Sequence, residues 1–150
     1  MEVNIFHRTE ERMEKLISFM ESKGASNVLG RNPDAKIDGL SHARALCTRE
    51  GVFTSDVILV PIEDGDRAEA LVSMGKTVIS IDLNPLSRTS KAATVPISDE
   101  IGRALENITR YVGELRGKED EIDSIIRSYS GERTRKDTIA FICDHLQKEA

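Results

Sequence analysis

The chain has 150 residues, of which 39% are hydrophobic and 31% charged, and this is the composition of one ordinary globular domain. Its formal net charge of -5 argues against binding to nucleic acid or to an anionic membrane, because phosphate groups would be repelled. Cys47 and Cys143 form no CxxC pair, so we expect neither a disulfide framework nor a zinc site. No apolar stretch is long enough to cross a bilayer, and the N-terminus lacks a signal-peptide core. We therefore expect a cytoplasmic protein with reduced thiols.

The first thirty residues suggest a strand, a helix and a second short strand. Residues 3–6 form the first apolar run, and residues 27–30 form the second. Between them, Thr9 is a suitable N-cap, and Gly24 is placed to end the helix. Four apolar residues recur there at helical spacing, which predicts one buried face: Met13, Leu16, Ile17 and Met20.

Periodicity fades between residues 31 and 55. A long irregular stretch inside a compact domain is often functional. One interpretation is a basic patch of His42, Arg44 and Arg49 that faces an anionic substrate. A solvated loop whose charges have no role fits the spacing equally well.

The centre of the chain predicts a βαβ unit. Residues 57–61 and 77–81 are apolar, β-branched runs without alternation, which is typical of parallel strands covered on both faces. Between them, residues 67–74 are expected to form a helix with one buried face, capped by Gly75. Asn84-Pro85 then ends the second strand. Because the two strands are parallel, the loops that follow them should meet at one edge of the sheet, where open α/β sheets bind ligands.

Those two loops, residues 63–66 and 82–89, are therefore the predicted site. The first contains Glu63, Asp64, Gly65 and Asp66, and its acids fit ribose hydroxyls, an amine or bound magnesium. A purely structural alternative is that Asp64 or Asp66 caps the following helix. In the second loop Asp82 has the position of the acid that binds a ribose in dinucleotide-binding folds, and Arg88 can grip a phosphate or a carboxylate.

The last third of the chain is expected to be mostly helical. Residues 93–97 predict another strand, in which Pro96 indicates an edge or an end. Ser98 is the expected N-cap of a long amphipathic helix that Gly117 stops. Two further short helices should be joined around Ser130-Gly131. We expect an α/β domain with a parallel sheet over residues 1–117 and a helical extension over residues 118–150.

No catalytic residue can be assigned from spacing. There is no GxxxxGK[ST] or GxGxxG motif, and the three histidines are scattered. A mechanism built on positioning and charge stabilisation, as in nucleotidyl transfer, needs no dedicated nucleophile.

Four segments carry a resemblance to a known family: residues 6–12, 39–42, 63–67 and 82–89. Over about residues 3–115 the chain closely resembles the archaeal phosphopantothenate synthetases, also called 4-phosphopantoate–β-alanine ligases. The resemblance implies a Rossmann-like homodimer that uses ATP and Mg²⁺ to join 4-phosphopantoate to β-alanine in coenzyme A biosynthesis, releasing AMP and pyrophosphate. The alternative is a non-catalytic α/β fragment that binds nucleotide or serves in dimerisation.

The resemblance also assigns residues to ligands. The nucleotide-binding residues it implies are Asp64, Gly65, Asp66, Asp82, Leu83, Asn84, Arg88 and Thr89. The substrate-binding residues it implies are His7, Arg8 and His42. It implies no protein metal ligand. Family members have a further N-terminal region, with arginines that contact ATP, before the segment matching residues 6–12. We therefore expect the chain alone to fold but to ligate little or nothing.

Overall fold

A three-stranded parallel sheet lies at the centre of the molecule. The structure is a computed structural model, and it describes residues 1–62 and 64–149. The strands are β3 (Val57–Val60), β4 (Thr77–Ile81) and β5 (Val95–Ile97), in the order β3-β4-β5. Val57 pairs with Thr77, and Ile79 pairs with Val95. The predicted parallel βαβ unit is confirmed, and Pro96 lies on an edge strand as expected.

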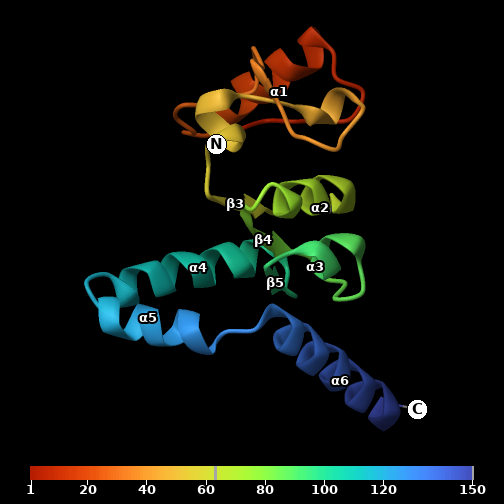
Figure 1. Cartoon of the computed structure of the whole chain (residues 1–150), viewed down its shortest axis with the longest axis vertical. Coiled ribbons are helices and arrows are strands. Elements are labelled where there is room, and N and C mark those ends of the chain that lie inside the picture. Colours follow the sequence, from red (N-terminus) through yellow and green to blue (C-terminus); the bar gives the residue numbers. More distant parts are fainter. Residues whose placement is uncertain (63, 150) are drawn as a thin grey trace.

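Two helices connect these strands and pack on each other. Helix α2 (Gly65–Ser73) links β3 to β4, and the short helix α3 (Arg88–Ala92) links β4 to β5. Gly75 follows α2 with φ +79°, the left-handed conformation expected of its cap. In Figure 1 both helices lie on one side of the sheet, and α4 leaves it on the other. The buried face of α2 places Ala68 and Leu71 against the central strand, where Val78 is fully buried.

The expectation that β3 is covered on both faces is wrong. Val57 and Leu59 are 56% and 40% exposed, whereas Ile58 and Val60 are half-buried. β3 is an edge strand of the described sheet, and α2 covers only one of its faces. β4, which has a neighbour on each side, shows the burial that we expected of both strands.

The N-terminal thirty residues form a small layer around helix α1 (Glu10–Ser22). Thr9 caps α1 by accepting a hydrogen bond from the Arg12 amide, as predicted. Met13 and Ile17 are buried with Val3 and Val28 in a separate apolar cluster. The strands predicted at residues 3–6 and 27–30 are wrong, because these segments form only a single parallel bridge, between Glu2 and Leu29.

Residues 31–55 are structured, so the solvated loop, one of the two interpretations considered for this stretch, is wrong. Strands β1 (Ala35–Lys36) and β2 (Leu46–Cys47) pair antiparallel, joined by a 3₁₀ turn, η1 (Ala43–Ala45). A distorted helical segment, η2 (Arg49–Phe53), follows. Ile37 and Cys47 are buried in the same cluster as Leu71 and Val78, so this stretch packs directly on the βαβ unit.

Three helices complete the chain: α4 (Ile101–Leu115), α5 (Glu119–Ser128) and α6 (Gly131–Glu149). Glu100, not Ser98, caps α4, because the Glu100 carboxylate reaches the amides of Gly102 and Arg103. Ala104 is the one buried residue of α4, so its apolar stripe is largely exposed. Figure 1 shows the α1 layer at one end of the molecule and α6 at the other. Among the described residues, no helix has the length and hydropathy needed to cross a membrane.

Candidate functional site

The two predicted loops meet at the edge of the sheet where the strands have their carboxyl ends. The amide of Asp64, after β3, donates a hydrogen bond of 2.9 Å to the Thr89 hydroxyl, after β4. Thr89 is fully buried, so this hydrogen bond holds the two loops together below the surface of the site. Glu63, which we expected to line the site, lies outside the described residues. The predicted convergence of the two loops is confirmed for the residues that the structure describes.

Asp64 begins α2 and also binds a buried arginine. Its carboxylate accepts a hydrogen bond of 3.2 Å from the Arg67 amide, which confirms the capping interpretation. The same carboxylate forms an ion pair with the guanidinium of Arg44, whose side chain is 8% exposed. Arg44 also stacks on Phe6, with 3.7 Å between the guanidinium carbon and the ring centroid. Asp64 thereby connects the sheet to both the N-terminal layer and the segment of residues 31–55.

The loop after β4 is ordered by its own side chains. One Asp82 oxygen accepts the Asn84 amide at 2.9 Å, and the other accepts the Ser87 hydroxyl at 2.5 Å. Ser87 in turn caps α3 by accepting the Ser90 amide at 3.0 Å. Leu83 and Asn84 are exposed at the tip of this loop. The chain thus presents Asn84 and the backbone around it at the carboxyl edge, while Asp82 fixes their conformation.

Arg88 joins the two helices on the outer surface of the site. Its guanidinium lies 2.5 Å from Asp66 and 3.0 Å from Glu69, both on α2. These carboxylates raise the pKa of Arg88 by hydrogen bonding and by charge. Because Arg88 is 60% exposed, the bridge orients the side chain more than it stabilises the fold.

The three residues assigned to substrate by resemblance lie in different places. His7 lines a cavity beside Asp64, and its φ of 50° is a left-handed conformation that is uncommon for a residue other than glycine. Arg8 donates to the carbonyls of Gly30 and Arg31 at 2.6 and 2.9 Å. His42 lies in a separate hollow with Asp66 and Glu69.

The basic patch that we considered is not formed. Arg44 is buried and paired with Asp64, His42 is exposed on another surface, and Arg49 stacks on Phe53 at 4.9 Å. His42 and Arg44 are only two residues apart, yet His42 is exposed and Arg44 is buried. The local pattern contains no signal for this, because the partner of Arg44 is Asp64, twenty residues further on at the N-cap of α2.

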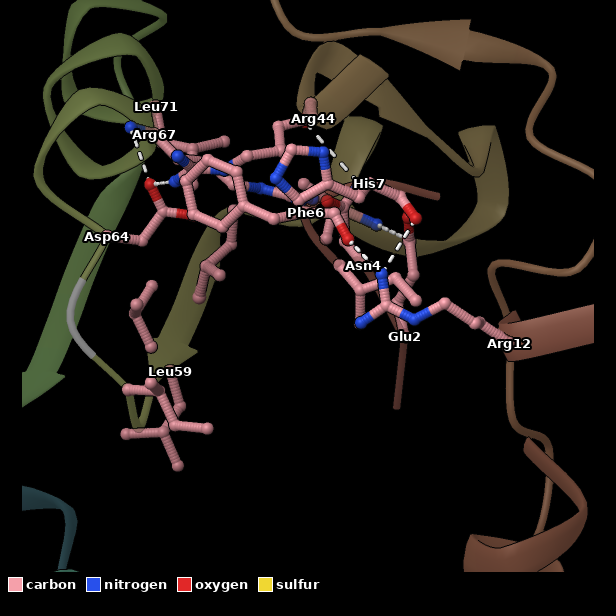
Figure 2. Close-up of a pocket in the computed structure, with 15 residues that line it drawn as sticks. Glu2, Asn4, Phe6, His7, Arg12, Arg44, Leu59, Asp64, Arg67 and Leu71 are labelled. Carbon is pink, nitrogen blue, oxygen red and sulfur yellow. Dashed lines mark hydrogen bonds and ion pairs between the residues drawn. The ribbon is translucent and has the colours of Figure 1, made fainter. Parts of the chain in front are cut away.

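A cavity of about 440 Å³ at this edge lies between the N-terminal layer and α2. Figure 2 shows Asp64, Arg67 and Leu71 on the α2 side, and Asn4, His7 and Arg12 on the other. β3 contributes an apolar wall with Ile58 and Leu59. Sequence reasoning missed Asn4 and Arg12 as lining residues, although Arg12 belongs to one of the four resembling segments.

The described residues offer little conventional catalytic machinery. No group of three or more His, Cys, Asp or Glu side chains that could hold a metal ion occurs among residues 1–62 and 64–149. The carboxylates of Asp64 and Asp66 are each engaged by an arginine. The arrangement is suited to binding and orienting a charged ligand by hydrogen bonds and charge.

Comparison with known proteins identifies the family. Residues 1–145 match the phosphopantothenate/pantothenate synthetase family. The chain belongs to this family. It is 49% identical over 151 aligned positions to a 4-phosphopantoate–β-alanine ligase of Methanosarcina mazei, covering 100% of this chain and 59% of that protein. The ligase of the same name from Methanospirillum hungatei is 47% identical over 97% of this chain and 58% of its own length.

A third relative, the 4-phosphopantoate–β-alanine ligase of Thermococcus onnurineus, is 41% identical over 100% of this chain and 58% of its own length. The chain therefore spans slightly less than three fifths of the length of these curated relatives. Because residues 1–145 include both loops and the cavity, the family relationship covers the whole candidate site.

Proposed function

We propose that this chain takes part in an ATP-dependent ligase reaction that joins 4-phosphopantoate to β-alanine. The products are 4'-phosphopantothenate, AMP and pyrophosphate, and the reaction belongs to coenzyme A biosynthesis. The single observation that supports it most is the family match over residues 1–145, which includes the converging loops at the carboxyl edge of the sheet. Open α/β sheets bind nucleotides at this edge.

In this proposal the loop after β4 binds ATP. Leu83 and Asn84 are exposed at the tip of this loop. The Asn84 side chain accepts the Leu86 amide through Oδ1, so its amino group is the donor left for the nucleotide, and Asp82 orients the residue. The start of α2, at Asp64, Gly65 and Asp66, forms the second wall, and Arg88 and Thr89 lie between the two. Gly65 permits the close approach of the first residues of α2 and α3, since a Cβ there would lie 2.5 Å from the Cβ of Arg88.

Magnesium is part of the proposed reaction, but the described residues form no cage for it. Asp64, Asp66 and Asp82 are already engaged by arginine, hydroxyl or amide groups, and no cluster of three metal-ligating residues is present in the described chain. Mg²⁺ usually reaches such sites on substrate phosphates, with only one or two carboxylates from the protein. We propose that it is delivered with ATP, and that Asp66 is the carboxylate best placed to approach it.

The test is AMP release by the purified chain, assayed alone and with a separately made N-terminal segment of a curated relative. We expect little or no release by the chain alone. In the mixture, AMP formation should require ATP, 4-phosphopantoate and β-alanine together, and omission of any one of them should abolish it. The second candidate is a non-catalytic fragment that binds nucleotide or dimerises, and it is favoured by the chain's coverage of 58–59% of its relatives. This alternative predicts ATP binding without AMP release, so one assay and one ATP titration separate the two.

We further propose that the chain acts in the cytoplasm as a homodimer. Exposed apolar side chains on α4 and α5 support a partner surface, since Val112 and Ile126 are 59% and 66% exposed. Contiguous apolar patches on a protein surface commonly mark interaction sites.

A further inference from the structure

Arg67 is buried and yet has no partner in the described part of the chain. Its side chain belongs to the buried face of α2, and the residue is only 8% exposed. Its backbone amide donates to Asp64, but within residues 1–62 and 64–149 its guanidinium forms neither an ion pair nor a hydrogen bond. Buried polar groups in folded proteins are nearly always paired, so an exception calls for a functional explanation.

The neighbouring charges do not provide that explanation. Burial lowers the pKa of Arg67, and the negative charge of Glu2 opposes the shift, but an arginine remains protonated at neutral pH in either case. Both Glu2 oxygens are occupied by the amides of Thr48 and Val52, at 2.9 Å each. Arg44 is as deeply buried as Arg67, but it has Asp64 as its ion-pair partner.

Arg67 lines the cavity between α2 and the N-terminal layer (Figure 2). Among the described residues, the fully sealed side-chain polar atoms without a partner are Thr48 Oγ1 and Ser80 Oγ, so the Arg67 nitrogens are not fully sealed. The cavity that Arg67 lines is the space from which a ligand can reach them. A planar guanidinium in such a place matches the two oxygens of a carboxylate or a phosphate.

Several other polar side chains around the cavity are already engaged by the protein, whereas the imidazole of His7, which also lines it, has no hydrogen bond within the described residues. Arg12 donates to the carbonyls of Phe6 and His7 at 2.8 and 2.7 Å, and Asn4 donates to the Leu46 carbonyl at 2.7 Å. The side of the cavity formed by β3 is apolar, with Ile58 and Leu59. A fitting ligand thus has one oxyanion for Arg67 and an aliphatic body for the β3 wall.

We propose that Arg67 anchors the oxyanion, a carboxylate or a phosphate, of a small aliphatic ligand in this cavity, apart from the exposed loop after β4. This inference deepens the proposed function, because 4-phosphopantoate carries both kinds of oxyanion on a branched aliphatic body. The anion site itself stands on geometry alone, so it can be tested without any ligase activity.

The first experiment titrates the whole chain with inorganic phosphate and, separately, with acetate, at constant ionic strength. The Arg67 Nε–H resonance in ¹H–¹⁵N spectra is the direct readout, assigned with the Arg67→Lys variant. It should shift and saturate with at least one of the two anions. Arg67→Met should weaken that binding by about tenfold or more, the effect of losing a hydrogen bond to a charged group.

The matched control is Arg110→Met, which removes an exposed arginine of α4 far from the cavity, and it should bind the anions as the unmodified chain does. Should Arg67→Met fail to fold, the resonance in the unmodified chain still decides the question. An Arg67 resonance that stays unchanged with both anions, or equal anion affinity in a folded Arg67→Met chain, overturns the proposal.

A second experiment compares 4-phosphopantoate with ATP and separates the two possible sources of the oxyanion. If Arg67→Met loses affinity for 4-phosphopantoate but not for ATP, the cavity holds the acyl substrate; the reverse result assigns it to a nucleotide phosphate. Both results support an anion site at Arg67. If neither compound binds while phosphate or acetate still shifts Arg67, the proposed ligase function fails and the anion site remains.

Discussion

At the residue scale, the Asp64 carboxylate combines two interactions that respond differently to substitution. Asp64→Asn keeps an oxygen that can cap α2, but it removes the negative charge beside Arg44. Because an unpaired charge is then left in a largely buried position, we expect the free energy of unfolding to fall by about 3 kcal/mol. Urea denaturation followed by circular dichroism measures this change.

The control for that substitution is Asp99→Asn, at the start of α4. Asp99 also pairs with an arginine, Arg103, but the arginine is 65% exposed. The midpoint of urea unfolding should therefore hardly move. Equal effects of the two substitutions would mean that the Arg44 pair is no stronger than a surface ion pair.

Asp82 presents a different case, because its hydrogen bonds are local and an amide can replace most of them. In Asp82→Asn one oxygen still accepts the Asn84 amide, and the Ser87 hydroxyl can rotate to accept a hydrogen bond. We expect thermal stability to change little. In the proposed complex Asp82 also accepts a ribose hydroxyl of ATP through a remaining lone pair, so loss of its charge should lower ATP affinity by about 1–3 kcal/mol.

Calorimetric titration with ATP and a thermal melt give the two numbers for Asp82→Asn. Asp120→Asn, an exposed residue in the first turn of α5, is the control and should alter neither. A lower melting temperature with unchanged ATP affinity would limit Asp82 to holding the loop after β4.

At the scale of elements, the contact between α2 and α3 depends on one glycine. A methyl group at Gly65 would lie 2.5 Å from the Cβ of Arg88, so Gly65→Ala must push the two helix starts apart. We expect this overpacking to cost about 1–3 kcal/mol of stability. Gly113→Ala in α4 is the matched control: it meets nothing within 4 Å and should stabilise the chain by about 1 kcal/mol. Thermal unfolding of both variants tests whether Gly65→Ala lowers the stability while Gly113→Ala raises it.

The elements that the sequence predicted well are those with local causes. Thr9 and Asp64 each cap the helix that follows them, and β4 has the predicted boundaries because its apolar, β-branched run is central in the sheet. Conversely, the pattern of β3 resembles that of β4, and no local feature says that β3 is an edge strand with an exposed face.

The distinction between local and tertiary causes also explains which features of the site could be predicted. The meeting of the two loops follows from parallel strands, so it was predictable from residues 57–81 alone. The burial of Arg44 and the opening of Arg67 into a cavity depend on how the N-terminal layer packs on α2, which only tertiary structure determines. The expected division between residues 1–117 and 118–150 remains a prediction.

At the scale of the whole molecule, the apolar stripe of α4 and α5 predicts self-association. Ile126→Glu replaces one of the most exposed apolar side chains of α5 with a charge, so it should shift the chain from dimer to monomer in sedimentation velocity runs. Ser124→Glu adds the same charge two residues earlier, on the opposite side of α5, and should leave the dimer intact. If both variants and the unmodified chain sediment as monomers, the homodimer proposal is wrong.

The outer edge of β3 has a consequence for how the protein behaves in concentrated solution. In the described chain no strand pairs with this edge, and Val57 and Leu59 beside it are exposed. Such an edge is a template for strand addition from another molecule, which proceeds without unfolding. Asp56 and Pro61 flank the strand, and a charge and a proline in these positions disfavour its extension and its pairing with another chain. Precipitation on storage should therefore depend on protein concentration and on these two residues, rather than on the melting temperature.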